Sequence, residues 1–152
     1  MGTSNKESIE KEVLNLGCGF KHMTDAINVD ISPLAKPDVI IDLEEGNLPF
    51  KDNQFKQVHV YHVLEHIKNL IPLMNEIYRV MKDEGQLFIK VPQGKGIWAD
   101  PTHVRGFSDI SFRYYCDYPF SEMYGIDTHF VEIKNDFLDN NDGGELYVVL
   151  QK

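Results

Sequence analysis

The strongest structural signal in the chain is Val13-Leu14-Asn15-Leu16-Gly17-Cys18-Gly19, a short apolar run that ends at two closely spaced glycines. Such a run predicts a buried strand that enters a tight loop. Glycine has no Cβ and tolerates positive φ, so the backbone of this loop can approach a ligand closely. A nucleotide-like cofactor is the expected ligand, and a plain turn is the alternative for a single G-x-G.

Other apolar runs follow, and several of them end at an acidic or polar residue. The expected strands after Val13–Leu16 are residues 27–29, 39–41, 57–61, 86–91, 129–133 and 146–150. Apolar residues spaced by three and four predict an amphipathic helix over 70–81, with Asn69 as its cap, Pro72 in its first turn and Gly85 as its stop. A second short helix is expected over 108–115, capped by Ser108 or Asp109, and residues 140–144 suit a hairpin turn.

Length and charge limit the classes of protein to which the chain can belong. Its 152 residues predict one domain, 1–152, in which we expect 1–10 to be flexible. A net charge of −9 without a basic patch argues against nucleic-acid and membrane partners, and no apolar run has membrane-span length. Two cysteines, Cys18 and Cys116, suggest no disulfide framework, so we expect a cytoplasmic protein. We also expect a monomer or homodimer.

Several motifs, taken in order, resemble those of class I S-adenosylmethionine-dependent methyltransferases, in particular a compact, type 11-like member. Residues 14–19 resemble the first motif, and Asp30 resembles the ribose-binding acid of the family. The later matches are Asp42-Leu43 with Leu48-Pro49-Phe50 on the adenine side, His62-Val63-Leu64-Glu65-His66 after the fourth strand, and Glu76-Ile77-Tyr78-Arg79-Val80-Met81-Lys82 with Gly85 before the fifth. The resemblance covers roughly residues 12–92.

The resemblance implies an α/β fold: a Rossmann-like, doubly wound, mostly parallel seven-stranded sheet with an antiparallel C-terminal strand. The implied cofactor is S-adenosylmethionine, and its expected contacts are Leu16, Gly17, Cys18, Gly19, Asp30, Ile31, Asp42, Leu43, His62, Val63 and His66. Only residues 20–26 separate Gly19 from the second strand, so the first crossover helix must shorten to about one turn. Lys82-Asp83-Glu84-Gly85 keeps the glycine of the family's turn without its proline.

The segment after the fifth strand is expected to hold the methyl acceptor, because loops after parallel strands meet at one crevice. We therefore assign residues 93–125 as an acceptor and lid segment, with His103 and Asp100 as catalytic candidates. Seven aromatic residues of this segment could exclude water from the donor: Phe107, Phe112, Tyr114, Tyr115, Tyr118, Phe120 and Tyr124. Structural roles are the alternative for each of these residues. The predicted reaction is methyl transfer to an oxygen or nitrogen atom of a small-molecule acceptor.

Two other functions fit parts of the sequence, and a third is disfavoured. His62-Val63-Leu64-Glu65-His66 also matches H-x-x-E-H, which would make the chain a zinc hydrolase, although we otherwise assign no metal ligand. The short first crossover favours a relic that binds the cofactor without catalysis. NAD binding is disfavoured, because His22 occupies the position at which the dehydrogenase fingerprint needs a small residue.

Overall fold

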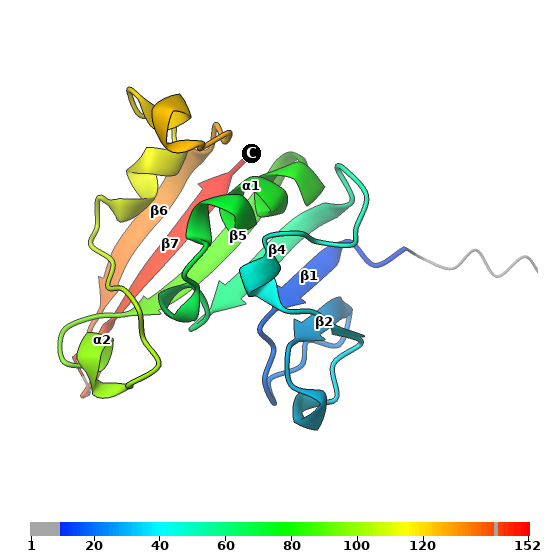
Figure 1. Ribbon diagram of the computed structural model, residues 1–152, viewed down its shortest axis with the longest axis horizontal. Coiled ribbons are helices and arrows are strands. Elements are labelled where there is room, and N and C mark those ends of the chain that lie inside the picture. Colours follow the sequence, from blue (N-terminus) through cyan, green and yellow to red (C-terminus); the bar gives the residue numbers. More distant parts are fainter. Residues whose placement is uncertain (1–9, 142) are drawn as a thin grey trace, which may run out of the picture.

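The computed structural model describes residues 10–141 and 143–152, in which seven strands form one sheet of order β3-β2-β1-β4-β5-β7-β6 (Figure 1). The strands are β1 (Val13–Leu16), β2 (Ala26–Asp30), β3 (Val39–Ile40), β4 (Phe55–Tyr61), β5 (Met81–Pro92), β6 (Val131–Leu138) and β7 (Glu145–Gln151). β7 is antiparallel to β5 and β6, and all other pairs are parallel. The predicted α/β fold with its antiparallel C-terminal strand is confirmed. Residues 1–9 of the segment expected to be flexible lie outside the described residues, as does Asp142.

Helical elements are short except for one. They are α1 (Leu70–Val80), α2 (Gly96–Ala99) and the 3-10 turns η1 (Pro33–Ala35), η2 (Leu43–Glu45), η3 (Leu64–His66), η4 (Ser111–Tyr115) and η5 (Ser121–Tyr124). α1 packs its apolar stripe on the sheet and buries Leu73, Met74 and Ile77 completely. No helix of the described residues is long and apolar enough to cross a membrane.

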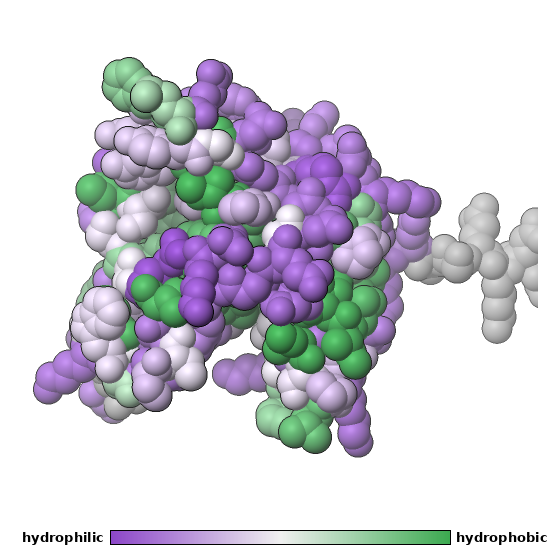
Figure 2. Space-filling model, viewed as in Figure 1, coloured by the Kyte–Doolittle hydropathy of each residue, from purple (hydrophilic) through white to green (hydrophobic). Residues whose placement is uncertain are grey.

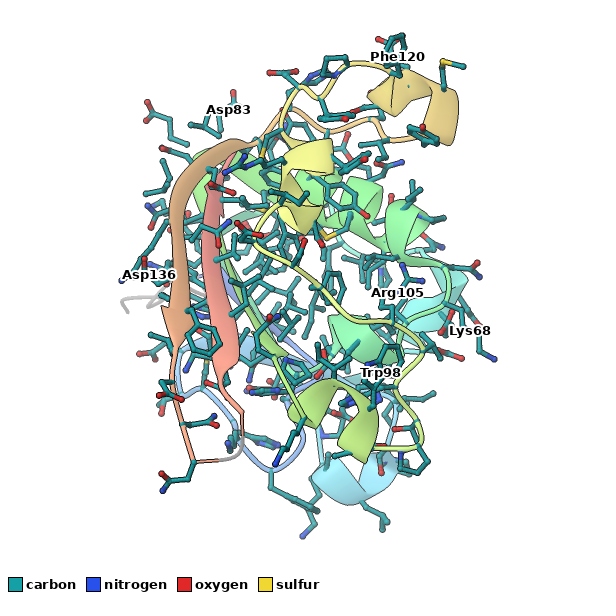
Figure 3. All side chains as sticks on the ribbon, turned by 90° about the vertical axis from the view of Figure 1, so that its left-hand side faces the viewer. Lys68, Asp83, Trp98, Arg105, Phe120 and Asp136 are labelled. Atoms are coloured by element: carbon teal, nitrogen blue, oxygen red, sulfur yellow. The ribbon has the colours of Figure 1, made fainter. Side chains whose placement is uncertain are left out.

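Strand alternation divides the sheet into two faces of different character. Leu14, Val58 and Leu87 point into the core beneath α1, and their neighbours Asn15 and His59 point to the other face. Figures 1 and 3 show the helical elements gathered on one side of the sheet. The other side of the sheet has no helix from the first crossover, because residues 17–25 contain turns and no helix. The shortened crossover is confirmed, and it lacks even the single helical turn that we expected.

The predicted stop of the long helix was wrong. α1 ends at Val80, and Gly85 lies inside β5, where it does not stop a helix. A Cβ at Gly85 would lie 2.8 Å from the carbonyl oxygen of Lys82, so glycine is needed there for close backbone packing. Asn69 does occupy the N-cap position of α1, but its side chain makes no capping hydrogen bond.

The second expected helix begins later than predicted. Residues 111–115 form η4, whose N-cap is Ile110, so neither Ser108 nor Asp109 caps it. The backbone N–H of Ser108 instead donates to Ser111 Oγ at 2.8 Å. β6 begins two residues beyond the predicted His129, which pairs with Cys116 in an isolated bridge before the strand starts.

Candidate functional site

A cavity of about 340 Å³ opens at the carboxyl ends of β1, β2 and β4. It lies next to the switch point of the sheet, the place between β1 and β4 at which the strand order reverses. Its lining residues are Gly17, Asp30, Ile31, Ile41, Asp42, Leu43, Glu44, His62, Val63, His66 and Ile67. Eight of the eleven cofactor contacts expected from the sequence are among them. Figure 2 shows the surface hollowed at this edge, between the lobe of α2 and the lobe of β2.

The glycine loop forms the floor of this cavity and of a neighbouring one. Gly17 and Gly19 both have positive φ, +65° and +48°, which favours glycine at both positions. With Cys18 they line a second cavity of about 590 Å³, which also contains Lys90 and Glu145. Burial raises the pKa of the Cys18 thiol, so it packs as an apolar group. Leu16 is fully buried in the core and lines neither cavity.

Two carboxylates organise the loops on the opposite wall. Asp30 accepts hydrogen bonds from the backbone N–H groups of Gly19 at 2.8 Å and Ser32 at 2.9 Å, so it ties the glycine loop to the end of β2. Asp42 is the N-cap of η2 and accepts from the N–H of Glu44 at 3.0 Å. Each oxygen keeps a second lone pair that a ligand hydroxyl can use.

His62 occupies the far side of the glycine loop in a strained conformation, with φ at +56°. Its Nε2 lies 2.7 Å from Glu145 Oε1, and its Nδ1 lies 3.5 Å from Glu65 Oε1. Contact with Glu65 and then Glu145 raises the pKa of this imidazole, which outweighs the opposing effect of burial. His62 therefore brings an imidazole to the boundary between the two cavities.

His66 lines the cavity and also lies beside both catalytic candidates, His103 and Asp100. Its ring packs edge-on against His103, with centroids 4.7 Å apart. Its Nδ1 lies 3.0 Å from Thr102 Oγ1, and that hydroxyl donates to Asp100 Oδ1 at 2.6 Å. The hydrogen bonds from Thr102 lower the pKa of the Asp100 carboxyl, which is an exposed group. The structure thus brings His103 and Asp100 to the same cluster as His66.

A third cavity, of about 500 Å³, lies against the start of α1. Its lining is Leu70, Ile71, Arg105, Gly106, Phe107, Ser111, Tyr114, Tyr115, Tyr124 and Ile126. The aromatic residues of 93–125 divide: Phe107, Phe112 and Tyr115 are buried, whereas Phe120 is 69% exposed. Figure 3 shows Phe120 at the top of the molecule, well separated from Trp98, so these two aromatic side chains of the segment do not lie over the same cavity.

Sequence reasoning missed several lining residues. Ile41 and Ile67 follow a strand and a 3-10 turn, and nothing in their local sequence distinguishes them from core residues. Lys90 and Glu145 reach the second cavity from β5 and β7, which pair antiparallel far apart in the chain. The one signal in the sequence that could have found such a residue is a position near the carboxyl end of a parallel strand close to the switch point. Of Lys90 and Glu145, only Lys90 has such a position.

The zinc-hydrolase interpretation lacks its structural basis. That motif needs His62 and His66 on one face of an α-helix with Glu65 between them. Residues 64–66 instead form the single 3-10 turn η3, and His62 precedes it with a left-handed backbone. Its histidines are therefore not presented as a helical ligand pair.

Residues 14–89, half of the chain, match the family described as methyltransferase domain. The chain therefore belongs to the methyltransferase-domain family. This match confirms the resemblance drawn from the motifs, and with it S-adenosylmethionine as the cofactor.

Other known proteins are similar to the chain in fold or in sequence. An S-adenosylmethionine-dependent methyltransferase from Archaeoglobus fulgidus superposes with a TM-score of 0.69 at 18% identity, covering 92% of this chain and 85% of that one. The 1,6-didemethyltoxoflavin-N1-methyltransferase of Burkholderia thailandensis, solved with its substrate and S-adenosylhomocysteine, has a TM-score of 0.66 at 16% identity and coverages of 92% and 70%. An uncharacterized protein of Methanocaldococcus jannaschii is 36% identical over 92 residues, 52% of this chain. The chain spans 40% of the length of that relative.

Proposed function

We propose that the chain transfers a methyl group from S-adenosylmethionine to an oxygen or nitrogen atom of a small-molecule acceptor. The observation that carries this proposal is the convergence of eight expected cofactor residues on one cavity at the carboxyl edge of the sheet. Ligands of open α/β sheets bind at this position. A volume of about 340 Å³ lies within the usual range for small-molecule sites.

The residues present fit the cofactor in character. Asp30 offers free carboxylate lone pairs to ribose hydroxyls, and Ile31, 60% exposed, offers an apolar side chain at the cavity wall beside it. Asp42 and Leu43 bound the cavity on the adenine side. At the other end no protein atom lies within 4 Å of the position of a Cβ on Gly19, which leaves room for the methionine portion. When bound, the cofactor supplies an electrophilic methyl group on a sulfonium.

We assign the third cavity to the acceptor. Its lining is largely apolar and aromatic, and Arg105 and Ser111 supply polar groups that could orient a ligand. Arg105 Nη2 donates to the carbonyl oxygen of Lys68 at 2.7 Å, which fixes its side chain beside the cavity; Figure 3 shows the two residues together. Of the predicted acceptor segment 93–125, residues 105–115 and Tyr124 then contribute the acceptor wall.

His103 and Asp100 are the proposed catalytic residues. His103 Nδ1 lies 2.7 Å from the carbonyl oxygen of Ile97 and its Nε2 points towards Glu65, so the ring is held in one orientation. Such a group can position an acceptor or take its proton. Asp100 Oδ2 lies 3.8 Å from His103 Nε2, so its carboxylate can stabilise the ring when the ring holds that proton.

Calorimetric titration with S-adenosylmethionine and S-adenosylhomocysteine, with NAD as the control, tests cofactor binding. Methyl transfer from labelled donor to a panel of small hydroxyl and amine compounds tests activity. His103→Ala should retain affinity for S-adenosylhomocysteine and lose turnover by about 100-fold, because it removes a catalytic group and no cofactor contact. Cofactor binding without turnover on any acceptor would favour the binding-only relic.

The same proposal includes a cytoplasmic location and a monomer or homodimer, without nucleic-acid or membrane partners. Both cysteines are free, which suits a reducing compartment. The net charge of −9 disfavours binding to phosphate backbones and anionic lipids.

A further inference from the structure

Glu65 is a buried carboxylate without a hydrogen-bond donor. Its side chain is 1% exposed, and neither oxygen has a hydrogen-bond partner among the described residues. The nearest basic atoms are His62 Nδ1 at 3.5 Å and His103 Nε2 at 4.0 Å, both outside hydrogen-bond geometry. A buried carboxylate in this condition is costly, so a missing positive group is expected beside it.

The two histidines beside Glu65 present lone pairs. The carbonyl oxygen of Ile97 can only accept, so His103 Nδ1 carries the hydrogen and Nε2 of the neutral ring is free to accept. Thr102 donates its hydroxyl proton to Asp100, so His66 Nδ1 must donate to Thr102 Oγ1. His66 Nε2 is then also a free lone pair. Fixing a histidine through its second nitrogen in this way is typical of metal ligands.

The three side chains are close enough to share one ion. One ligand atom from each of Glu65, His66 and His103 lies within 4.8 Å of the others. Two ligands about 2.1 Å from one metal lie at most about 4.2 Å apart, so small side-chain rotations would close the site. The backbone N–H of Val104 donates to the carbonyl oxygen of Glu65 at 2.8 Å and holds the two ligand-bearing segments together.

We propose that Glu65, His66 and His103 bind one divalent first-row transition-metal ion. Two imidazoles and one carboxylate suit Mn²⁺, Fe²⁺, Co²⁺ or Zn²⁺ better than Mg²⁺ or Ca²⁺, which prefer oxygen ligands. Three protein ligands leave coordination positions open. Because His66 also lines the cofactor cavity, an open position can hold an oxygen atom of the acceptor beside the cofactor.

This last step rests on the proposed function and specifies the acceptor as one that presents an oxygen to a metal. His103 then acts by holding the ion, which positions the acceptor. Ion binding itself does not depend on methyl transfer, so the two can be measured separately.

The test is calorimetric titration of Mn²⁺, Zn²⁺ and Mg²⁺ into the full chain after treatment with a chelator, with and without S-adenosylhomocysteine. We expect one Mn²⁺ or Zn²⁺ per chain and at least 100-fold weaker Mg²⁺ binding. Glu65→Gln and His103→Ala should each weaken Mn²⁺ binding by at least 100-fold. His129→Ala is the matched control, because His129 is exposed and pairs with Asp117 away from the cluster.

Thermal unfolding shows whether the variants fold. In chelator-treated protein Glu65→Gln should melt at or above the wild-type temperature, because it removes an uncompensated buried charge. Added Mn²⁺ should raise the melting temperature of wild type and His129→Ala only. Binding that survives Glu65→Gln, or no Mn²⁺ or Zn²⁺ binding at all, would overturn the metal site. If S-adenosylhomocysteine still binds in that case, the proposed function stands; metal binding without cofactor binding would overturn the proposed function and leave the metal site in place.

Discussion

Gly17 and Val63 touch across the floor of the cofactor cavity, and a Cβ at Gly17 would lie 2.2 Å from Val63 Cγ2. The two residues come from the loops after β1 and β4, the strands on either side of the switch point. A Cβ at Gly19, in contrast, would lie more than 4 Å from every protein atom outside Gly19 and its two chain neighbours. The two glycines therefore have different roles: Gly17 allows two loops to pack, and Gly19 keeps space open.

Alanine substitutions should separate these roles. Gly17→Ala should lower the free energy of unfolding by more than about 2 kcal/mol, because it adds a steric clash to a strained φ. Gly19→Ala should cost only about 1 kcal/mol of strain, yet weaken S-adenosylhomocysteine binding by at least about 10-fold, because its Cβ enters the cavity. Urea unfolding and calorimetry measure the two effects. Wild-type affinity in Gly19→Ala would move the methionine portion of the cofactor away from this loop.

A double variant extends the argument. Val63→Ala removes the atoms that a Cβ at Gly17 would meet, so it should recover part of the stability lost in Gly17→Ala. The strain of the left-handed backbone should remain. Additive losses in the double variant would show that the loops do not pack as described.

Asp30→Ala should weaken S-adenosylhomocysteine binding by about 10- to 100-fold, because charge-assisted hydrogen bonds to ribose contribute about 1.5–3 kcal/mol. Asp30 also holds the N–H of Gly19, so part of the loss could come from the loop. Asp38→Ala is the control: Asp38 similarly accepts from the N–H of Asn28 at 2.8 Å, but it lines neither cavity. Equal loss of affinity in both variants would argue that Asp30 does not contact the ribose.

Local sequence predicted much of this architecture, and it named eight residues that line one cavity. Val13–Leu16 with its two glycines identified the central strand, and the acidic residues Asp30 and Asp42 marked two strand ends that meet at one cavity. Both signals depend on neighbours in the chain. The role of Gly85 was predicted wrongly because it depends on close approach to the backbone carbonyl of Lys82 and to those of Phe55 and Lys56 in β4, contacts that no helix pattern contains.

The cluster of Glu65, His66 and His103 could not be predicted from local sequence, for a related reason. Glu65 and His103 are far apart in sequence, and the hydrogen bonds that fix His66 and His103 come from Thr102 and a backbone carbonyl. The H-x-x-E-H spacing pairs His62 with His66, whereas the proposed metal site uses His66 and His103. Only the packed loops show which nitrogen atoms are free.

Arg79 should prove important for stability. It donates from Nη1 and Nη2 to the carbonyl oxygens of Phe50 and Leu48 at 2.9 Å each, and it also pairs with Glu76 and Asp52. The carboxylates of Glu76 and then Asp52 raise the pKa of its guanidinium, and the bonds to the two carbonyls anchor the segment before β4. Arg79→Ala should lower the free energy of unfolding by about 2–3 kcal/mol.

Arg79→Lys should recover less than half of that loss, because an ammonium group cannot reproduce the planar fork of donors. Urea unfolding measures both variants. Lys134→Ala is the matched control, since Lys134 pairs with Asp136 on the surface at 3.1 Å and should contribute at most about 0.5 kcal/mol. An Arg79→Ala loss as small as that of the control would contradict the anchoring role.

His59 lies on the face of the sheet opposite α1, and it makes the stability of the folded chain sensitive to pH. Its ring stacks on Phe88 with centroids 4.6 Å apart, and its Nδ1 lies 2.9 Å from the hydroxyl oxygen of Tyr61. Burial lowers the pKa of this imidazole below its ordinary value of 6.5. The unfolded chain therefore binds the proton more readily, and the stability that His59 contributes is present above about pH 6.5 and lost as the pH falls.

His129 has the opposite sign, because its hydrogen bond to Asp117 raises the pKa of the ring; its contribution is present below about pH 6.5 and lost as the pH rises. Urea unfolding near pH 8 and pH 5.5 separates the two histidines. On acidification His59→Gln should lose less stability than wild type, and His129→Gln should lose more. An acid loss in His59→Gln as large as that of wild type would show that His59 takes up its proton as freely in the folded sheet as in the unfolded chain.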